Sequence, residues 1–150
     1  MNPPFRLESV LKLRCRERDQ AAKEVADAAA AIALLDAKLT DIETEQRHME
    51  LMRRRSSEGT VVLNQILDAE RYQLVLAAQY SHIAKDRSLM VQELERRRAK
   101  LVTRQQAVKV LEKLEQNHRE RNAEEQMKRQ QMLLDEWSQT QTSIATRGMS

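Results

Sequence analysis

The chain has 150 residues, 33% of them charged, and its four aromatic residues are too few for the core of a compact globule. Its net charge is +3, from 26 basic and 23 acidic residues, so the overall balance does not call for nucleic acid or an anionic membrane as a partner. The longest apolar run, Ala28 to Leu35, is far shorter than the roughly 20 residues of a membrane-spanning helix. The N-terminus also lacks the hydrophobic core of a signal peptide, so we expect a cytoplasmic protein.

The first predicted helix covers about residues 5–55. Asn2 suits a helix cap, and Pro3 and Pro4 suit the first turn, where a missing N–H has no cost. Apolar residues then recur at alternating intervals of four and three, which is typical of a coiled-coil seam. These positions are Ala21, Val25, Ala28, Ile32, Leu35, Leu39, Ile42, Gln46 and Met49, and all but Gln46 are apolar.

A turn is predicted at about residues 56–60. Arg53, Arg54 and Arg55 complement the negative end of a helix dipole, and Gly59 suits the left-handed position that ends a helix. Ser57 or Thr60 then serves to cap the segment that follows.

The second predicted helix covers about residues 61–142, followed by a polar C-terminal tail that we expect to fray. Its seam has the same alternating spacing and is mostly apolar. The positions are Leu76, Tyr80, Ile83, Arg87, Met90, Leu94, Arg97, Leu101, Arg104, Val108 and Leu111, with Val62, Ile66 and Ala69 continuing the pattern backwards.

Together these patterns predict an all-α fold, a single coiled-coil domain over residues 1–150 in which two long helices form an antiparallel hairpin. Folding at Gly59 pairs residues whose numbers add up to about 118, so that Phe5 lies opposite Lys113. The seam of the second helix fades after Leu114, near the point where the first helix begins. We therefore expect the second helix to be longer and to overhang by about 25 residues, nearly 40 Å at about 1.5 Å per residue.

No residue pattern indicates catalysis, a cofactor or a metal. The histidines His48, His82 and His118 are far apart and are expected to be solvated, and no Cys or His shows the spacing of metal ligands. Cys15 is the single cysteine, so an internal disulfide is impossible. A two-helix rod offers no cleft to enclose a substrate, so we do not expect an enzyme.

Basic residues gather at two places that the hairpin brings together. In the predicted register Arg14 faces Arg104 and Arg18 faces Lys100, which destabilises the rod unless the arginines extend outward along it or an acidic partner neutralises them. A solvated basic face without a partner is an equal alternative. Nucleic acid is not expected, because acidic residues alternate with the basic ones and no aromatic residues are interleaved for base stacking.

A second candidate contact surface lies near the turn. Tyr72, Leu76, Tyr80 and Ile83 share roughly one helical face, and a two-helix coil cannot cover every side of a tyrosine. Exposed aromatic and aliphatic side chains are typical of protein contacts, and packing within the seam is the alternative for each residue.

At four places the sequence resembles the FliJ family of flagellar export proteins. These are the opening segment Phe5–Arg14, the alanine-rich segment Ala21–Ala33, the Leu-Glu-Lys-Leu segment at 111–114 and the Leu-Asp-Glu-Trp segment at 134–137. The segments follow in the same order at similar distances, and the length and turn position also agree. The resemblance therefore spans nearly the whole chain.

The resemblance implies a stalk of the flagellar type III export apparatus, similar to the central stalk of rotary ATPases. It implies insertion into the ring of the export ATPase FliI, and contacts with the export gate protein FlhA and with export chaperones at the cytoplasmic face of the inner membrane. The implied gate contacts are Ile42, Met49, Tyr72, Leu76 and Ile83. The implied ring contacts are Leu7, Leu11, Arg14, Arg18, Arg104, Met127, Leu134 and Trp137.

From the predicted geometry, our hypothesis is that the overhang from Glu115 to Trp137 enters the ATPase ring while the Gly59 end points toward the gate. Three alternatives remain at this point. They are the equivalent stalk of a virulence injectisome, a generic coiled-coil scaffold that homodimerises through the same seams, and a nucleic-acid-binding rod.

Overall fold

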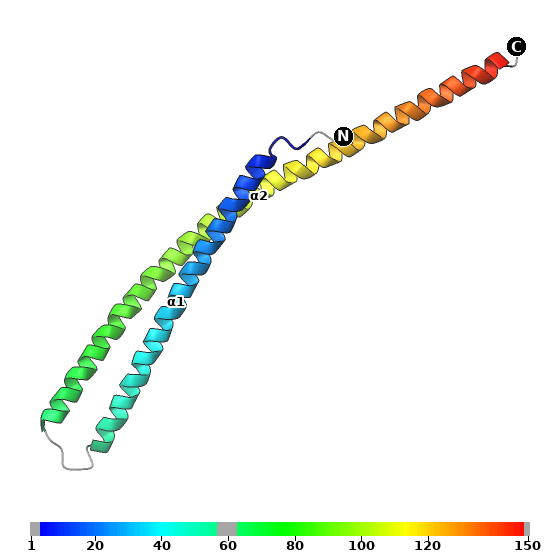
Figure 1. Ribbon diagram of the computed structural model, residues 1–150. Helices are drawn as coiled ribbons and strands as arrows, with labels where there is room; N and C mark the ends of the chain where they lie inside the picture. The colour runs from blue at the N-terminus through cyan, green and yellow to red at the C-terminus, as the bar shows by residue number, and fades with distance from the viewer. Residues whose placement is uncertain (1–3, 57–62, 149–150) are drawn as a thin grey trace. The chain divides into compact units, whose positions relative to one another are not determined.

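The computed structural model describes residues 4–56 and 63–148, and within them the chain consists of two helices (Figure 1). Helix α1 spans Glu8–Ser56 and helix α2 spans Leu63–Gly148. No strand occurs among the described residues. The predicted all-α, two-helix fold is therefore confirmed.

The ends of α1 follow the predicted helix chemistry. The backbone N–H of Glu8 donates to the carbonyl of Phe5 at 3.2 Å, and the acidic Glu8 lies in the first turn, where it complements the helix dipole. Arg53, Arg54 and Arg55 occupy the last turn. The predicted cap Asn2 with Pro3, and the predicted turn residues Ser57, Gly59 and Thr60, lie outside the described residues.

The chain divides into two compact units, each built from a stretch of both helices. The hairpin unit comprises residues 18–103, and the terminal unit comprises residues 1–17 together with 104–150. Each unit is described here by itself.

In the hairpin unit, α1 and α2 run side by side in opposite directions (Figure 1). Tyr80 donates to Glu43 at 3.1 Å and Lys100 donates to Glu24 at 3.2 Å, so the later residue of α2 meets the earlier residue of α1. The core is a single line of buried seam positions. These are Ala21, Ala28, Ile42, Leu76 and Leu94, all at most 9% exposed.

In the terminal unit, the start of α1 and its preceding residues lie antiparallel to α2. Val108 is buried at the seam, Arg104 donates to Glu17 at 3.0 Å, and the ring of Phe5 lies 5.7 Å from the ring of His118. Half-buried positions of α2 end at Asn122, and every described residue from 123 to 148 is exposed. The predicted overhang is thus present, with α2 extending beyond the part that α1 covers (Figure 1).

The pairing register differs from the predicted one by nearly a turn. Residue numbers of most cross-helix pairs add up to 121–124, as for Glu17 with Arg104 and Glu24 with Lys100, instead of about 118. The prediction took its register from one presumed turn residue. The observed register is the one that places carboxylates of α1 opposite cations of α2. It also places Ala28 level with Leu94.

Two further details differ from the expectation at the C-terminal end. The uncovered stretch begins after Asn122 and not at Glu115, because the polar Glu115 and His118 still occupy half-buried seam positions. Helix α2 then continues to Gly148, where we had expected a frayed tail after about residue 142. The hydroxyls of Thr140, Thr142 and Thr146 each donate to the carbonyl four residues earlier, so these side chains satisfy their donors within the helix.

Candidate functional site

The basic residues are neutralised inside the molecule to a greater extent than predicted. In the terminal unit, Glu17 accepts hydrogen bonds from Arg14 at 2.9 Å and from Arg104 at 3.0 Å, so the two arginines share one carboxylate. Arg14 and Arg104 thus approach each other from the two helices, as predicted, but the Glu17 carboxylate lies between them and offsets the expected repulsion. The hydrogen bond from Arg14, together with the nearby charges of both arginines, lowers the pKa of Glu17.

The predicted opposition of Arg18 and Lys100 in the hairpin unit is wrong. Lys100 pairs with Glu24 and not with Arg18, and Arg18 donates to Asp19 at 3.1 Å on its own helix. The hydrogen bond from Lys100 is the main reason that the pKa of Glu24 is lowered. Arg97, a seam arginine, donates to the Glu24 backbone carbonyl at 2.7 Å.

Helix α2 also carries its own carboxylates among these cations. Glu93 accepts hydrogen bonds from Arg96 and Arg97 at 2.9 Å each, which lowers its pKa from 4.5 to about 2. Arg98 pairs with Glu95 at 2.8 Å. With this register the stretch no longer requires an external acidic partner to explain its stability.

The residues implied as gate contacts fall into two groups. Ile42 and Leu76 are buried at the seam, so their side chains hold the hairpin together and present little surface. Met49 and Ile83 are half-buried, and Tyr72 is 38% exposed. Among the five, Tyr72 offers the most accessible large side chain.

The two tyrosines of the hairpin unit bridge the helices with their hydroxyls. Tyr72 donates to Glu45, and Tyr80 donates to Glu43. In each pair the hydrogen bond to the carboxylate is the main reason that the tyrosine pKa is raised. Each ring therefore lies along the side of the hairpin with its polar end fixed.

Sequence reasoning missed a second apolar face on the same stretch of α2. Leu67, Leu74 and Val75 are 45%, 72% and 50% exposed, on the side of α2 away from the seam. Leu67 and Leu74 are seven residues apart and share one helical face, and Val75 lies about 100° to one side of Leu74. These apolar residues are visible in the sequence, but they do not follow the spacing of the seam and were therefore not selected.

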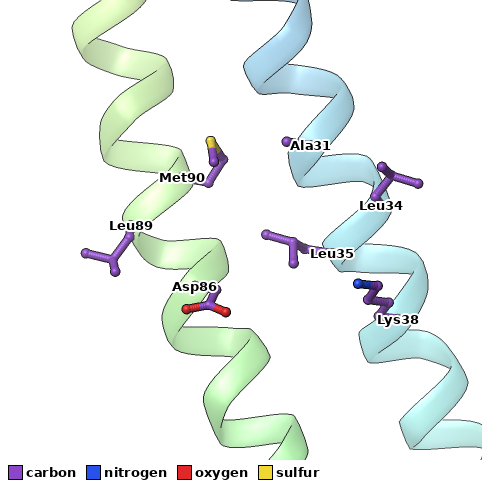
Figure 2. A pocket seen from close by; sticks show the side chains of 7 residues that line it. All are labelled: Ala31, Leu34, Leu35, Lys38, Asp86, Leu89 and Met90. Carbon is purple, nitrogen blue, oxygen red and sulfur yellow. The ribbon is translucent and has the colours of Figure 1, made fainter.

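An open apolar groove lies farther along the hairpin unit. Figure 2 shows Leu35 of α1 and Met90 of α2 pointing into the space between the helices, while Leu34 and Leu89 point outward. Lys38 and Asp86 lie at one end with opposite charges, and Ala31 completes the lining. None of these seven residues was among the predicted contacts.

Of the implied ring contacts near the N-terminus, Leu7, Leu11 and Arg14 lie in the paired part of the terminal unit, and Arg18 lies in the hairpin unit. Leu7 and Leu11 are half-buried, as seam packing requires. His118, expected to be solvated, is instead half-buried against Phe5, and its ring nitrogen lies 3.2 Å from the Asn122 amide. His48 and His82 are exposed.

The implied ring contacts near the C-terminus are all accessible. Met127, Leu134 and Trp137 are 70%, 60% and 62% exposed on the uncovered stretch of α2. Leu133, which belongs with them to the apolar cluster that the sequence predicts at the end of the overhang, is 64% exposed, and Met132 and Ile144 are 63% and 65% exposed in the same stretch. Six large apolar side chains of this one stretch are thus 60–70% exposed.

The described residues contain no cluster of three or more His, Cys, Asp or Glu side chains placed to hold a metal ion. Within residues 4–56 and 63–148, neither helix has a segment apolar and long enough to cross a bilayer. Cys15 is half-buried and its thiol is free.

Comparison with known proteins gives one family. The family model described as "Flagellar FliJ protein" matches residues 3–146, nearly the whole chain. No curated protein matches the chain. No solved structure matches it either.

Proposed function

The chain belongs to the flagellar FliJ protein family, which associates it with flagellar type III protein export, and from this premise we propose that it is the coiled-coil stalk of the export apparatus. In this role it links the export ATPase FliI to the export gate protein FlhA and to export chaperones. Membership in a flagellar family favours this system over a virulence injectisome, and the intramolecular use of both seams argues against a scaffold that dimerises through them.

One observation carries the proposal. In the terminal unit α2 continues past its paired part as a single helix, and every described residue from 123 to 148 is exposed. A lone helix is about 10–12 Å across, narrower than a pair of packed helices, and so suits the central hole of a ring. Its exposed Met127, Leu134 and Trp137 supply apolar anchors for the wall of that hole.

The gate contact belongs on the hairpin unit. Tyr72 is its accessible aromatic side chain, and Met49 and Ile83 are half-buried at seam positions. Ile42 and Leu76 act indirectly, because their burial fixes the position of the helix that carries Tyr72. Contact with the gate would hold the protein at the cytoplasmic face of the inner membrane without a spanning segment of its own.

Shortening the chain tests the ATPase contact. A chain that ends at Asn122 keeps all half-buried positions of α2 and loses the uncovered stretch. We expect it to lose binding to the purified cognate FliI in a pull-down and to keep its binding to the cytoplasmic domain of FlhA.

Circular dichroism of the shortened chain serves as the control for folding, with helical signal reduced only in proportion to the residues removed. Undiminished binding of the shortened and folded chain to the ATPase would contradict the proposed insertion.

A further inference from the structure

The uncovered stretch of α2 carries a second seam of its own. Its exposed side chains recur at alternating intervals of three and four, the spacing of residues that interlock with another helix. The positions are Met127, Gln130, Leu134, Trp137, Gln141 and Ile144. The apolar members are 60–70% exposed, so nothing within the terminal unit fills this seam.

This seam does not continue the one that binds α1. From Val108 to Asn122 the α1-facing positions of α2 are half-buried or buried, and the same phase carried onward reaches Glu125, Arg129, Met132 and Glu136, of which only Met132 is apolar. The apolar positions after Asn122 are displaced by two residues, or about 200° around the helix at about 3.6 residues per turn. A longer α1 would therefore meet three charged side chains and Met132, and not Leu134 or Trp137, so this seam serves a different helix.

The order of residues along the second seam is the same from either end: apolar, Gln, apolar, apolar, Gln, apolar. When two copies lie antiparallel about the midpoint between Leu134 and Trp137, Leu134 of each meets Trp137 of the other. Met127 then meets Ile144, and Gln130 meets Gln141, whose amides can donate to and accept from one another. Each layer joins an a position to a d position of the heptad repeat, with large and small side chains alternating as close packing requires.

The flanks of the seam support an identical partner. From 126 to 145 the six residues that flank the seam positions are uncharged. They are Gln126, Gln131, Leu133, Ser138, Thr140 and Ala145. The hairpin seam differs, since Lys100 beside it is matched by Glu24 of α1. Charged flanks select a partner of opposite charge, whereas uncharged flanks allow two identical chains to approach without repulsion.

The buried area is sufficient for association. Leu133 joins Met127, Leu134, Trp137 and Ile144 in lying 60–70% exposed, and one Trp side chain alone contributes about 150–250 Å². Over two copies the covered surface reaches the order of 1,000 Å², at which specific interfaces begin.

We propose that the stretch of α2 from Met127 to Ile144 pairs antiparallel with the same stretch of a second copy of this chain. The self-paired form covers Met127, Leu134 and Trp137, the side chains that the proposed function assigns to the ATPase ring. Self-pairing is thus a state in which the chain is held back from the ring. The inference does not rest on the ring contact, because association is measured without the ATPase.

The test is sedimentation equilibrium of the full chain over a wide concentration range, read together with tryptophan fluorescence. Trp137 is the only tryptophan, so its emission reports this seam alone and should shift to shorter wavelength as dimer forms. Leu134→Glu should raise the dimer dissociation constant about tenfold or more, since a carboxylate would face Trp137 of the other copy. Met132→Glu is the matched control, because Met132 is 63% exposed but off the seam, and its dimer should be unchanged.

A charge pair tests the orientation. Gln130→Glu combined with Gln141→Lys places opposite charges in contact in an antiparallel pair and like charges in contact in a parallel one. We expect the dimer to persist and to tighten at low salt, while Gln130→Glu with Gln141→Glu dissociates it. A chain that stays monomeric at every concentration, or a Glu/Lys variant that falls apart, would overturn the proposal.

Discussion

Helix α2 carries two seams of similar spacing, of which one is covered by α1 and the other is exposed. Positions such as Leu76, Leu94 and Val108 are at most 8% exposed beneath α1. Leu134 and Trp137, set on equally regular spacing, are 60% and 62% exposed. The comparison shows that the spacing of apolar residues indicates that a helix has a partner, but not which chain supplies that partner.

Phase and charge distinguish the two seams. The covered seam has cations at its positions and flanks, and the carboxylates of α1 meet them, as Asp36 meets Arg87 and Glu17 meets Arg104. The exposed seam is turned to another side of the helix and has uncharged flanks. The seam that pairs within this chain is thus distinguished by cations on α2 that lie opposite carboxylates on α1.

The largest expected effect on the free energy of unfolding comes from shortening a buried side chain of the covered seam. Leu76→Ala removes a side chain that is 3% exposed, and we expect it to lower the free energy of unfolding by about 2–4 kcal/mol. Leu134→Ala makes the same change at a position that is 60% exposed and should lower it by no more than about 0.5 kcal/mol in dilute protein. Urea unfolding followed by circular dichroism measures both. Equal losses at the two positions would mean that both seams are covered in the isolated chain.

Placing a larger side chain at a buried alanine of the covered seam should have the next largest effect on stability. Ala28 is 1% exposed and lies where the two helices of the hairpin unit approach closely, so Ala28→Leu should cost about 1–3 kcal/mol through displaced side chains. Ala123→Leu, at an exposed position just beyond the covered seam, is the control and should leave thermal stability almost unchanged. A harmless Ala28→Leu would show that the helices are farther apart at this layer than its burial indicates.

The smallest expected effect is the loss of stability at low pH that follows from protonation of the paired carboxylates. The pKa values of Glu17 and Glu24 are lowered by their cationic neighbours, and that of Glu93 is lowered from 4.5 to about 2. Because the folded chain binds these protons less readily than the unfolded chain, the contribution is complete above about pH 4.5 and is lost as the pH falls toward about 2. The midpoint temperature of unfolding should therefore fall over this range.

Single substitutions check the assignment. Glu93→Gln and Glu17→Gln should each make the acid-induced fall shallower, because the group that takes up the proton is gone. Glu136→Gln on the uncovered stretch is the control and should leave the slope as it is. A slope identical in all three variants would mean that these ion pairs, which are partly exposed, are too screened by solvent to matter.

Much of the fold was predictable from local patterns. Every predicted seam position from Ala21 to Met49 and from Leu76 to Leu111 is buried or half-buried, because a heptad repeat without proline permits little else than a paired helix. The exposed Met127, Leu134 and Trp137 were also predicted, since no apolar residue remained in the first helix to cover them.

The errors have a common origin. Placing Arg18 against Lys100 depended on a register taken from one glycine, and the same register gave no place to the Glu17 carboxylate between Arg14 and Arg104. His118 was judged from its isolation in the sequence. A shift of nearly one turn exchanges which charges meet without changing which face is apolar. Only packing of the whole interface discriminates between such registers.

The sequence by itself determined that two helices form, that they pair along regular seams, and that the second helix outlasts its cover. These follow from spacing and composition, which act locally and need no knowledge of the partner's position. The tertiary structure decided the register, the sharing of Glu17 by two arginines, and the contact of Phe5 with His118. These depend on side chains far apart in the chain, whose distances exist only once both helices have packed.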